Sequence, residues 1–221
     1  MRLGVCVFGK ENDMKIAILI YDGITALDAV GPYDMLNRVP GTDICFVAKE
    51  TGAMRTGNGA LGLVADHTLA DVAAADVLLV PGGSKGLVEA IHDPAHKGWI
   101  RAIDKTTQWT TSVCSGALFL GAAGLLEGRR ATTHWRAAHG LAKYGATYVG
   151  ERYVHDGKYL TAAGVSAGID MALYLIDQIE GRDTAQAVQL SAEYVPQPPF
   201  PPVSAAAASS DLKARVAKLA V

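Results

Sequence analysis

Cys114 is the residue of this chain whose surroundings point most clearly to chemistry. An apolar, β-branched run ends at Val113, and a helical pattern of small residues begins directly after the cysteine. A cysteine at such a tight strand-to-helix turn lies over the end of a parallel sheet, near backbone N–H groups and the positive end of the next helix. Both features favour the reactive thiolate. We therefore interpret Cys114 as a catalytic nucleophile, against the alternative of a buried small hydrophobe, the usual state of a free cysteine.

Asp28 lies in the apolar segment ALDAVGP, where an unpaired carboxylate would be costly to bury. One interpretation is an internal hydrogen bond that fixes a break of the surrounding helix at Gly31-Pro32. The other is an acid beside Cys114 that shares one proton with the sulfur and passes it to and from a substrate. The sequence favours neither interpretation over the other.

Gly82 and Gly83 follow a buried strand in the segment VPGG. Two glycines allow the backbone to turn its N–H groups toward the cysteine, as donors to a developing oxyanion. A plain tight turn is the alternative. Ser115 is expected to cap the helix that follows Cys114, or to place its hydroxyl on the reacting group, and the two roles are compatible.

His134 follows Cys114 by 20 residues, in the run ATTHW. A cysteine–histidine pair is typical of hydrolases of the protease type. A histidine packed at a strand end explains the residue equally well. The remaining histidines have no motif around them and are expected on the surface: His67, His92, His96, His139 and His155.

The elements that must position these residues alternate between strands and helices. Apolar runs predict buried strands at 15–21, 44–48, 76–80 and 110–113, a hairpin within 51–68, and shorter strands at 131–134, 147–149, 153–155 and 159–161. Helical patterns cover 25–39, interrupted near Gly31-Pro32, and 84–91, 94–106, 115–126, 136–144, 166–180 and 184–194. This alternation predicts an α/β fold with a doubly wound, mostly parallel sheet. Ligands of such sheets bind at the carboxyl ends of the strands, where Asp28, Gly82 and Cys114 would meet.

Composition narrows the function classes. Of the 221 residues, 50% are hydrophobic and 19% charged, with a formal net charge of −2, which fits one domain without a basic surface for nucleic acid or anionic membrane. No apolar run approaches the roughly 18 residues of a membrane span. Three scattered cysteines indicate neither a disulfide framework nor a structural metal site, and suit a reducing cytoplasm. Cys45 is expected in the core, and Cys6 in an N-terminal leader.

The chain is expected to divide into three parts. Residues 1–13 are interpreted as a poorly ordered leader, because the first clear strand begins after Met14. Residues 14–203 form the domain, which ends in a proline-fixed extended segment at 196–203. Residues 204–221 are alanine-rich and predict a short helical tail.

These features together resemble the ThiJ/PfpI superfamily, which is related to the class I glutamine amidotransferases. The resemblance rests on LDAVGPYDML, VPGG, SVCSGALFLGAAGLLEGRRATTHW, TAAGVSAGIDMAL and QLSAEYVPQPPF, and covers about residues 15–200. It implies a flavodoxin-like sheet with a cysteine nucleophile elbow. Carried over residue by residue, Cys114 is the nucleophile and Asp28 the acid/base partner. Ser115 stands where a threonine is often found.

Within the superfamily, these segments resemble the isocyanide hydratases. That resemblance implies hydration of an isocyanide to an N-substituted formamide through a thioimidate on Cys114, without metal or organic cofactor, in a homodimer. A second hypothesis is a cysteine hydrolase or a glyoxal-directed hydratase that depends on His134. A third is a non-catalytic oxidation sensor or ligand-binding domain, since an exposed thiol of low pKa is also what peroxide attacks.

Overall fold

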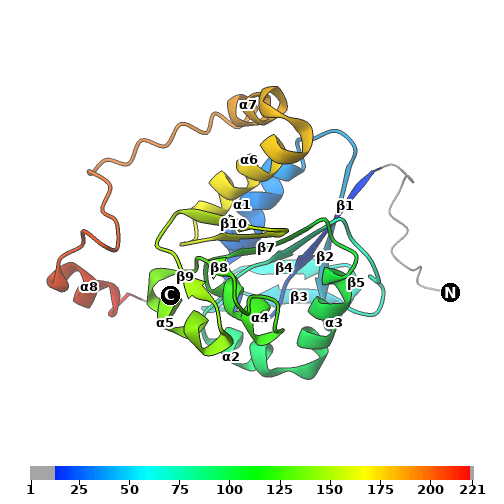
Figure 1. Ribbon diagram of the computed structural model, residues 1–221, viewed down its shortest axis with the longest axis horizontal. Helices are drawn as coiled ribbons and strands as arrows, with labels where there is room; N and C mark the ends of the chain where they lie inside the picture. Colours follow the sequence, from blue (N-terminus) through cyan, green and yellow to red (C-terminus); the bar gives the residue numbers. More distant parts are fainter. Residues whose placement is uncertain (1–12, 220–221) are drawn as a thin grey trace.

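The central sheet of the computed structural model, which describes residues 13–219, has seven strands in the order β10-β11-β7-β6-β1-β2-β5 (Figure 1). The strands are β1 (Met14–Leu19), β2 (Thr42–Ala48), β5 (His67–Thr68), β6 (Val77–Val80), β7 (Trp109–Val113), β10 (Tyr153–Asp156) and β11 (Tyr159–Ala162). All pairings in this sheet are parallel except that of β10 with β11. The mostly parallel sheet expected from the sequence is confirmed.

Helices cover both faces of the sheet, as a doubly wound fold requires. In Figure 1, α1 (Ala26–Leu36) and α6 (Ala167–Glu180) lie together on one face. The opposite face carries α2 (Lys85–His92), α3 (Pro94–Asp104) and α4 (Ala117–Ala122). Outside these layers lie α7 (Arg182–Ser191), which packs on α6, the short α5 (Ala138–Leu141), and α8 (Ser210–Val216).

Two small sheets complete the domain. The hairpin expected within 51–68 consists of β3 (Gly52–Arg55) and β4 (Gly62–Ala65), paired antiparallel. A parallel pair is formed by β8 (Arg130–Ala131) and β9 (Thr147–Tyr148). The strand expected at 131–134 is therefore shorter, and its residues Thr132 to His134 lead from β8 toward the Cys114 region.

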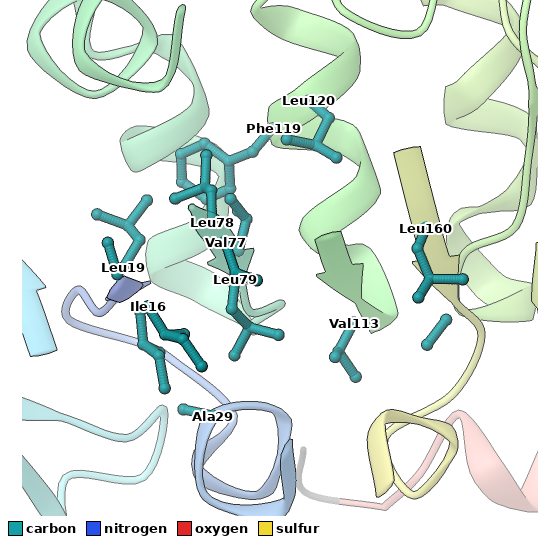
Figure 2. Close-up of a cluster of buried hydrophobic side chains, with 14 of the residues drawn as sticks. Ile16, Leu19, Ala29, Val77, Leu78, Leu79, Val113, Phe119, Leu120 and Leu160 are labelled. Atoms are coloured by element: carbon teal, nitrogen blue, oxygen red, sulfur yellow. The ribbon is translucent and has the colours of Figure 1, made fainter. Parts of the chain in front are cut away.

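The core lies on both faces of the sheet because its central strands are apolar throughout. Each residue of β6 and the last four of β1 are buried. Figure 2 shows Phe119 and Leu120 of α4 on one side of these strands and Ala29 of α1 on the other. Burial from both sides fixes the strand ends, and with them the loops that carry the chemistry-bearing residues.

Several element boundaries differ from those expected. The predicted break of the first helix is absent: α1 runs continuously through Pro32. Gly31 lets α6 approach, since a Cβ there would lie 3.0 Å from Ile169 Cγ1. The helix after Cys114 begins with a 3-10 turn and ends at Ala122 rather than residue 126, because Gly124 takes a left-handed φ of 80°.

The remaining differences concern the second half of the chain and its ends. The helix expected over 136–144 is divided into α5 between two 3-10 turns, Trp135–Ala137 and Ala142–Tyr144. The tail is helical only in α8, whose N-cap Ser209 accepts a hydrogen bond from the Leu212 N–H at 3.2 Å. The predicted leader, with Cys6, lies almost wholly outside the described residues. Within 13–219, no helix is both long and apolar enough to cross a membrane.

Candidate active site

Three neighbouring strands of the sheet, β7, β6 and β1, bring the predicted site residues to one edge. Cys114 follows β7 directly, Gly82 and Gly83 follow β6, and Asp28 lies in the first turn of α1, the helix after β1. All of these ends are carboxyl ends, because the three strands are parallel. The structure therefore brings Asp28, the two glycines, Cys114 and its neighbour Ser115 together.

Cys114 has the backbone conformation of a nucleophile elbow. Its φ is 58°, in the left-handed region that non-glycine residues rarely enter. The turn is held by a hydrogen bond from Thr133 Oγ1 to the Cys114 carbonyl oxygen at 2.8 Å. Gly116 allows the helix to start against β6, since a Cβ there would lie 2.0 Å from the Val80 carbonyl oxygen. The side chain is nearly buried, with 7% of the residue exposed.

Asp28 is completely buried, yet only one of its carboxyl oxygens has a hydrogen-bond partner. Oδ2 accepts from the Gly82 N–H at 3.0 Å, across 54 residues of sequence. Oδ1 is buried without a partner among the described residues. The hydrogen bond expected to fix a break of the helix does not exist, because the carboxyl is held by the loop after β6. One oxygen is thus left for a substrate or a proton.

The Gly82-Gly83 loop joins Asp28 to the elbow. A Cβ on Gly82 would lie 2.6 Å from the Ser115 N and 2.9 Å from Asp28 Oδ2, so only glycine fits there. The Gly83 N–H donates to Ser115 Oγ at 3.1 Å, and this hydroxyl lies 3.2 Å from the Gly83 carbonyl oxygen, to which it donates. Ser115 therefore holds the loop and makes no capping bond.

These bonds engage both glycine N–H groups, whose expected role as oxyanion donors stays a prediction. The Gly82 N–H donates to Asp28, and the Gly83 N–H donates to Ser115 in the elbow turn. Their observed function is to hold the carboxyl and the hydroxyl in place. Proton transfer by Asp28, rather than donation from the loop, is the chemistry this arrangement offers.

The protonation of Asp28 and Cys114 also differs from the expected thiolate. Burial raises the pKa of Asp28 to about 7, opposed by its hydrogen bond from Gly82 and by the Cys114 thiol. Burial, reinforced by the negative charge of Asp28, raises the pKa of Cys114 to about 12, although the N–H and hydroxyl of Ser115 act in the opposite direction. The sulfur therefore holds its proton more strongly than the Asp28 carboxyl does.

His134 is not joined to this group. It is half-buried, and its Nδ1 accepts from the Arg136 N–H at 3.3 Å, so that it caps the 3-10 turn that follows. Burial and the Arg136 charge lower its pKa. In the described part of the chain, no hydrogen bond links His134 to Cys114 or Asp28. Its neighbour Thr133 makes the contact with the elbow instead.

Tyr21 and Thr133 are the site residues that sequence reasoning missed. Tyr21 is buried, and its hydroxyl donates to the Pro81 carbonyl oxygen, in the loop that carries Gly82 and Gly83, at 3.1 Å. Burial and the nearby Asp28 and Cys114 raise its pKa well above the ordinary value. The only signal for Tyr21 was its place at the end of the first apolar run.

An acid with one free oxygen beside a buried thiol can add a proton and a sulfur nucleophile across an unsaturated carbon. This chemistry needs no metal ligand, and within residues 13–219 no group of three or more His, Cys, Asp or Glu is placed to hold a metal ion. The site is therefore suited to nucleophilic addition assisted by one transferable proton.

Comparison with known proteins agrees with this geometry. The isonitrile hydratase of Pseudomonas putida is 42% identical over 187 residues, which cover 85% of this chain and 81% of that protein. An HTH-type transcriptional regulator of Pseudomonas aeruginosa is 32% identical over 151 residues, or 67% of this chain and 44% of the regulator.

The crystal structure of a ThiJ/PfpI family protein from Pseudomonas syringae superimposes with a TM-score of 0.88 at 36% identity, covering 92% of this chain and 84% of that one. Both the resemblance stated from the motifs and the flavodoxin-like fold with its elbow are thereby confirmed. Residues 14–178 match the DJ-1/PfpI family. The chain belongs to the DJ-1/PfpI family.

Proposed function

We propose that this protein hydrates isocyanides to N-substituted formamides. The observation that carries the proposal is the completely buried Asp28 carboxyl, held through one oxygen beside Cys114 with the other oxygen free. The 42% identity with the isonitrile hydratase of Pseudomonas putida supports the same reaction, because isonitrile is another name for isocyanide.

In the proposed first step, Cys114 sulfur bonds to the terminal isocyanide carbon. In the reactive form Asp28 is ionised and the thiol carries the proton, a form that grows as pH rises through the Asp28 pKa of about 7 because the pKa of Cys114 is raised further, to about 12. Asp28 accepts this proton as the carbon–sulfur bond forms and donates it to the same carbon. The product is a thioimidate, R–N=CH–S–Cys114, which contains all atoms of the substrate and the thiol.

In the second step, water adds to the thioimidate carbon. Asp28 accepts a proton from the attacking water and donates it to the nitrogen, which gives R–NH–CH(OH)–S–Cys114. It then transfers the hydroxyl proton to the sulfur as the carbon–oxygen double bond forms and the carbon–sulfur bond breaks. The products are R–NH–CHO and the original thiol. One water is consumed and nothing is oxidised or reduced, so the proposed mechanism uses only substrate, water and the two side chains, without a cofactor.

The test is turnover of an alkyl and an aryl isocyanide by the purified protein, with formamide measured by chromatography and mass spectrometry. We expect formamide from the wild type and none above background from Cys114→Ala. Cys45→Ala, a change at the other described cysteine, is the control and should retain turnover. Equal rates in wild type and Cys114→Ala would overturn the proposal.

The hydrolase alternative is separated by His134→Ala. A cysteine hydrolase that depends on this imidazole should lose nearly all activity. The proposed hydratase should lose less than about tenfold, since general acid–base catalysis is assigned to Asp28. The raised pKa of Cys114 likewise gives no support to the oxidation sensor, because peroxide reacts with thiolate.

We also propose that the protein acts as a homodimer in the cytoplasm. A hydrophobic composition at low charge supports the dimer, and three cysteines without disulfide or metal-ligand spacing support the reducing compartment. Analytical ultracentrifugation at micromolar concentration is expected to give twice the chain mass. A monomer under those conditions would contradict the assembly without affecting the reaction.

A further inference from the structure

The segment that follows β8 passes beside the Cys114 elbow and brings Thr133 into contact with it. Neighbouring hydrogen bonds hold this segment in place. The Thr132 N–H donates to Thr161 Oγ1 at 2.9 Å, and the Thr132 hydroxyl donates to the Glu151 carbonyl oxygen at 3.0 Å. Thr133 itself is completely buried, so its side chain acts on the elbow and not on a substrate that enters from solvent.

The Thr133 hydroxyl donates to the main chain of the nucleophile. Thr133 Oγ1 lies 2.8 Å from the Cys114 carbonyl oxygen, across 19 residues of sequence. The φ of Cys114 is 58°, which is unfavourable for a residue with a Cβ and persists only where the surroundings hold it. A buried bond to this carbonyl oxygen is one such restraint.

The peptide group that Thr133 holds also carries a donor to the sulfur. The Cys114 carbonyl and the Ser115 N–H belong to one planar peptide unit, so fixing the direction of the C=O also fixes that of the N–H. Burial and the Asp28 charge raise the pKa of Cys114, and the Ser115 N–H, as a hydrogen-bond donor to the sulfur, opposes them. A hydrogen bond to the C=O further polarises the N–H of the same peptide.

The neighbouring loop amides are directed elsewhere. The Gly82 N–H donates to Asp28 and the Gly83 N–H to Ser115, whereas the Ser115 N–H is the elbow amide that faces the sulfur. When the thiol proton leaves for Asp28, negative charge develops on the sulfur. A hydrogen bond to a charged acceptor is stronger than one to a neutral acceptor, so the direction of the Ser115 N–H matters most at that moment.

We propose that Thr133 is a positioning residue for the nucleophile, whose hydroxyl holds the Cys114–Ser115 peptide so that the Ser115 N–H faces the sulfur as the proton leaves. The effect on turnover rests on the proposed function. The effect on the reactivity of the thiol does not, because any reagent that reacts with the thiolate reports it.

The experiment compares three variants. Thr133→Val removes the hydroxyl at nearly constant volume, and Thr133→Ser retains it. Thr111→Val is the matched control, because the buried Thr111 hydroxyl also donates to a carbonyl oxygen, that of Leu78, at 2.9 Å. The main chain at Thr111 stays held by the pairing of β7 with β6. We therefore expect a similar loss of Tm in the two valine variants and different effects on Cys114.

The first readout is the rate at which iodoacetamide alkylates Cys114 at about pH 8, followed by mass spectrometry of its peptide. Thr133→Val should lower this rate by about tenfold, and Thr133→Ser and Thr111→Val should stay within about twofold of the wild type. Alkylation of Cys45, which is buried in the core, reports opening of the whole domain in the same samples. It should be equal in the two valine variants.

The second readout is turnover of an isocyanide. Thr133→Val should lower kcat by about tenfold and leave KM within about threefold, since Thr133 does not contact the substrate, and Thr133→Ser should restore kcat. If Thr133→Val does not fold, Thr133→Ala, which places no methyl group against the Cys114 carbonyl oxygen, takes its place with the same expectations.

Unchanged or faster alkylation of Cys114 in Thr133→Val would overturn the inference, as would equal slowing in Thr111→Val. Unchanged kcat of Thr133→Val in a protein that makes formamide would also overturn it. Slow alkylation of Thr133→Val in a protein whose wild type makes no formamide would refute the proposed reaction and support the positioning role of Thr133.

Discussion

Two aspartates, Asp28 and Asp104, are buried at opposite edges of the same sheet, and they differ in how fully their carboxyl oxygens are hydrogen-bonded. Asp104, at the amino ends of β7 and β11, accepts hydrogen bonds from the Thr110 hydroxyl at 2.7 Å and the Tyr159 hydroxyl at 3.3 Å. It also forms an ion pair with Lys158 at 3.1 Å. Asp28, at the carboxyl ends, has only the Gly82 N–H and the Cys114 thiol as partners, and its Oδ1 has none among the described residues.

The difference separates a structural carboxylate from a reactive one. Both oxygens of the Asp104 carboxyl have partners, a lysine and two hydroxyl groups, so neither is left for a substrate. A carboxyl with one free oxygen in a buried site can gain and lose a proton near neutral pH, as the raised pKa of Asp28 to about 7 indicates. Burial of a carboxyl alone therefore does not mark a functional residue, and the unpartnered oxygen of Asp28 is what supports its proposed role.

Asp28→Asn gives the largest expected effect on activity. We expect turnover to fall by about a hundredfold or more, because the amide keeps the hydrogen bond to Gly82 but carries no transferable proton. Asp28→Glu should be milder, since the carboxyl remains. Formamide production per folded molecule is the measurement, and unchanged turnover in Asp28→Asn would remove Asp28 from the mechanism.

Asp28→Asn should also be more stable than the wild type above neutral pH. The pKa of Asp28 is raised from 3.8 to about 7 in the folded state, so stability present below about pH 4 is lost as pH rises through about 7. That loss is on the order of 4 kcal/mol, and Asp28→Asn avoids it. Thermal unfolding at about pH 8 and about pH 5 should show the gain mainly at the higher pH. A lower Tm at both would indicate a structural role instead.

Asp104→Ala should lower stability and leave turnover unchanged, the opposite of what is expected for Asp28→Asn. It leaves Lys158, which is one third exposed, without its carboxylate and two buried hydroxyls without an acceptor. We expect the free energy of unfolding to fall by about 3 kcal/mol. Turnover per folded molecule should not change. Urea denaturation and formamide assays on the same preparation decide this, and a selective loss of turnover would refute the division between the two edges.

Ser115→Ala should have the smallest effect of these changes. It leaves the Gly83 N–H without the hydroxyl that it now contacts at 3.1 Å, which costs about 1 kcal/mol of stability and loosens the loop that holds Asp28. Turnover should fall by less than about tenfold. The matched control is Ser112→Ala, because the Ser112 hydroxyl is buried without a partner in residues 13–219 and its removal should not destabilise. Equal destabilisation by both changes would contradict the role given to Ser115.

The sequence predicted the elbow and its edge of the sheet because both follow from local patterns. The apolar run before Cys114 and the small residues after it specify a strand, a turn and a helix without reference to distant residues. The partner of Asp28 could not be predicted in this way, because Gly82 lies 54 residues away and the contact depends on β6 pairing beside β1.

The protonation state of Cys114 also could not be predicted from the residues next to it in the sequence. The elbow's amide groups favour thiolate, but burial and the charge of Asp28 outweigh them, and both depend on how α1 packs over the loop after β6. His96 is a different case. It was expected on the surface and is buried, although the sequence contained a signal for its burial. His96, Trp99, Ile100 and Ile103 recur at the spacing of one helical face, and all four are buried. The absence of a motif around His96 hid this periodicity.

The central claim is that the Asp28–Cys114 pair reacts while it holds one proton. The most direct test is the pH dependence of kcat/KM for one isocyanide. We predict a rise of about tenfold per pH unit at acidic pH, with a midpoint near the Asp28 pKa of about 7, and a level region above it. A profile that is flat through about pH 5 to 8, or that rises only near the ordinary cysteine pKa of about 8.5, would contradict the claim.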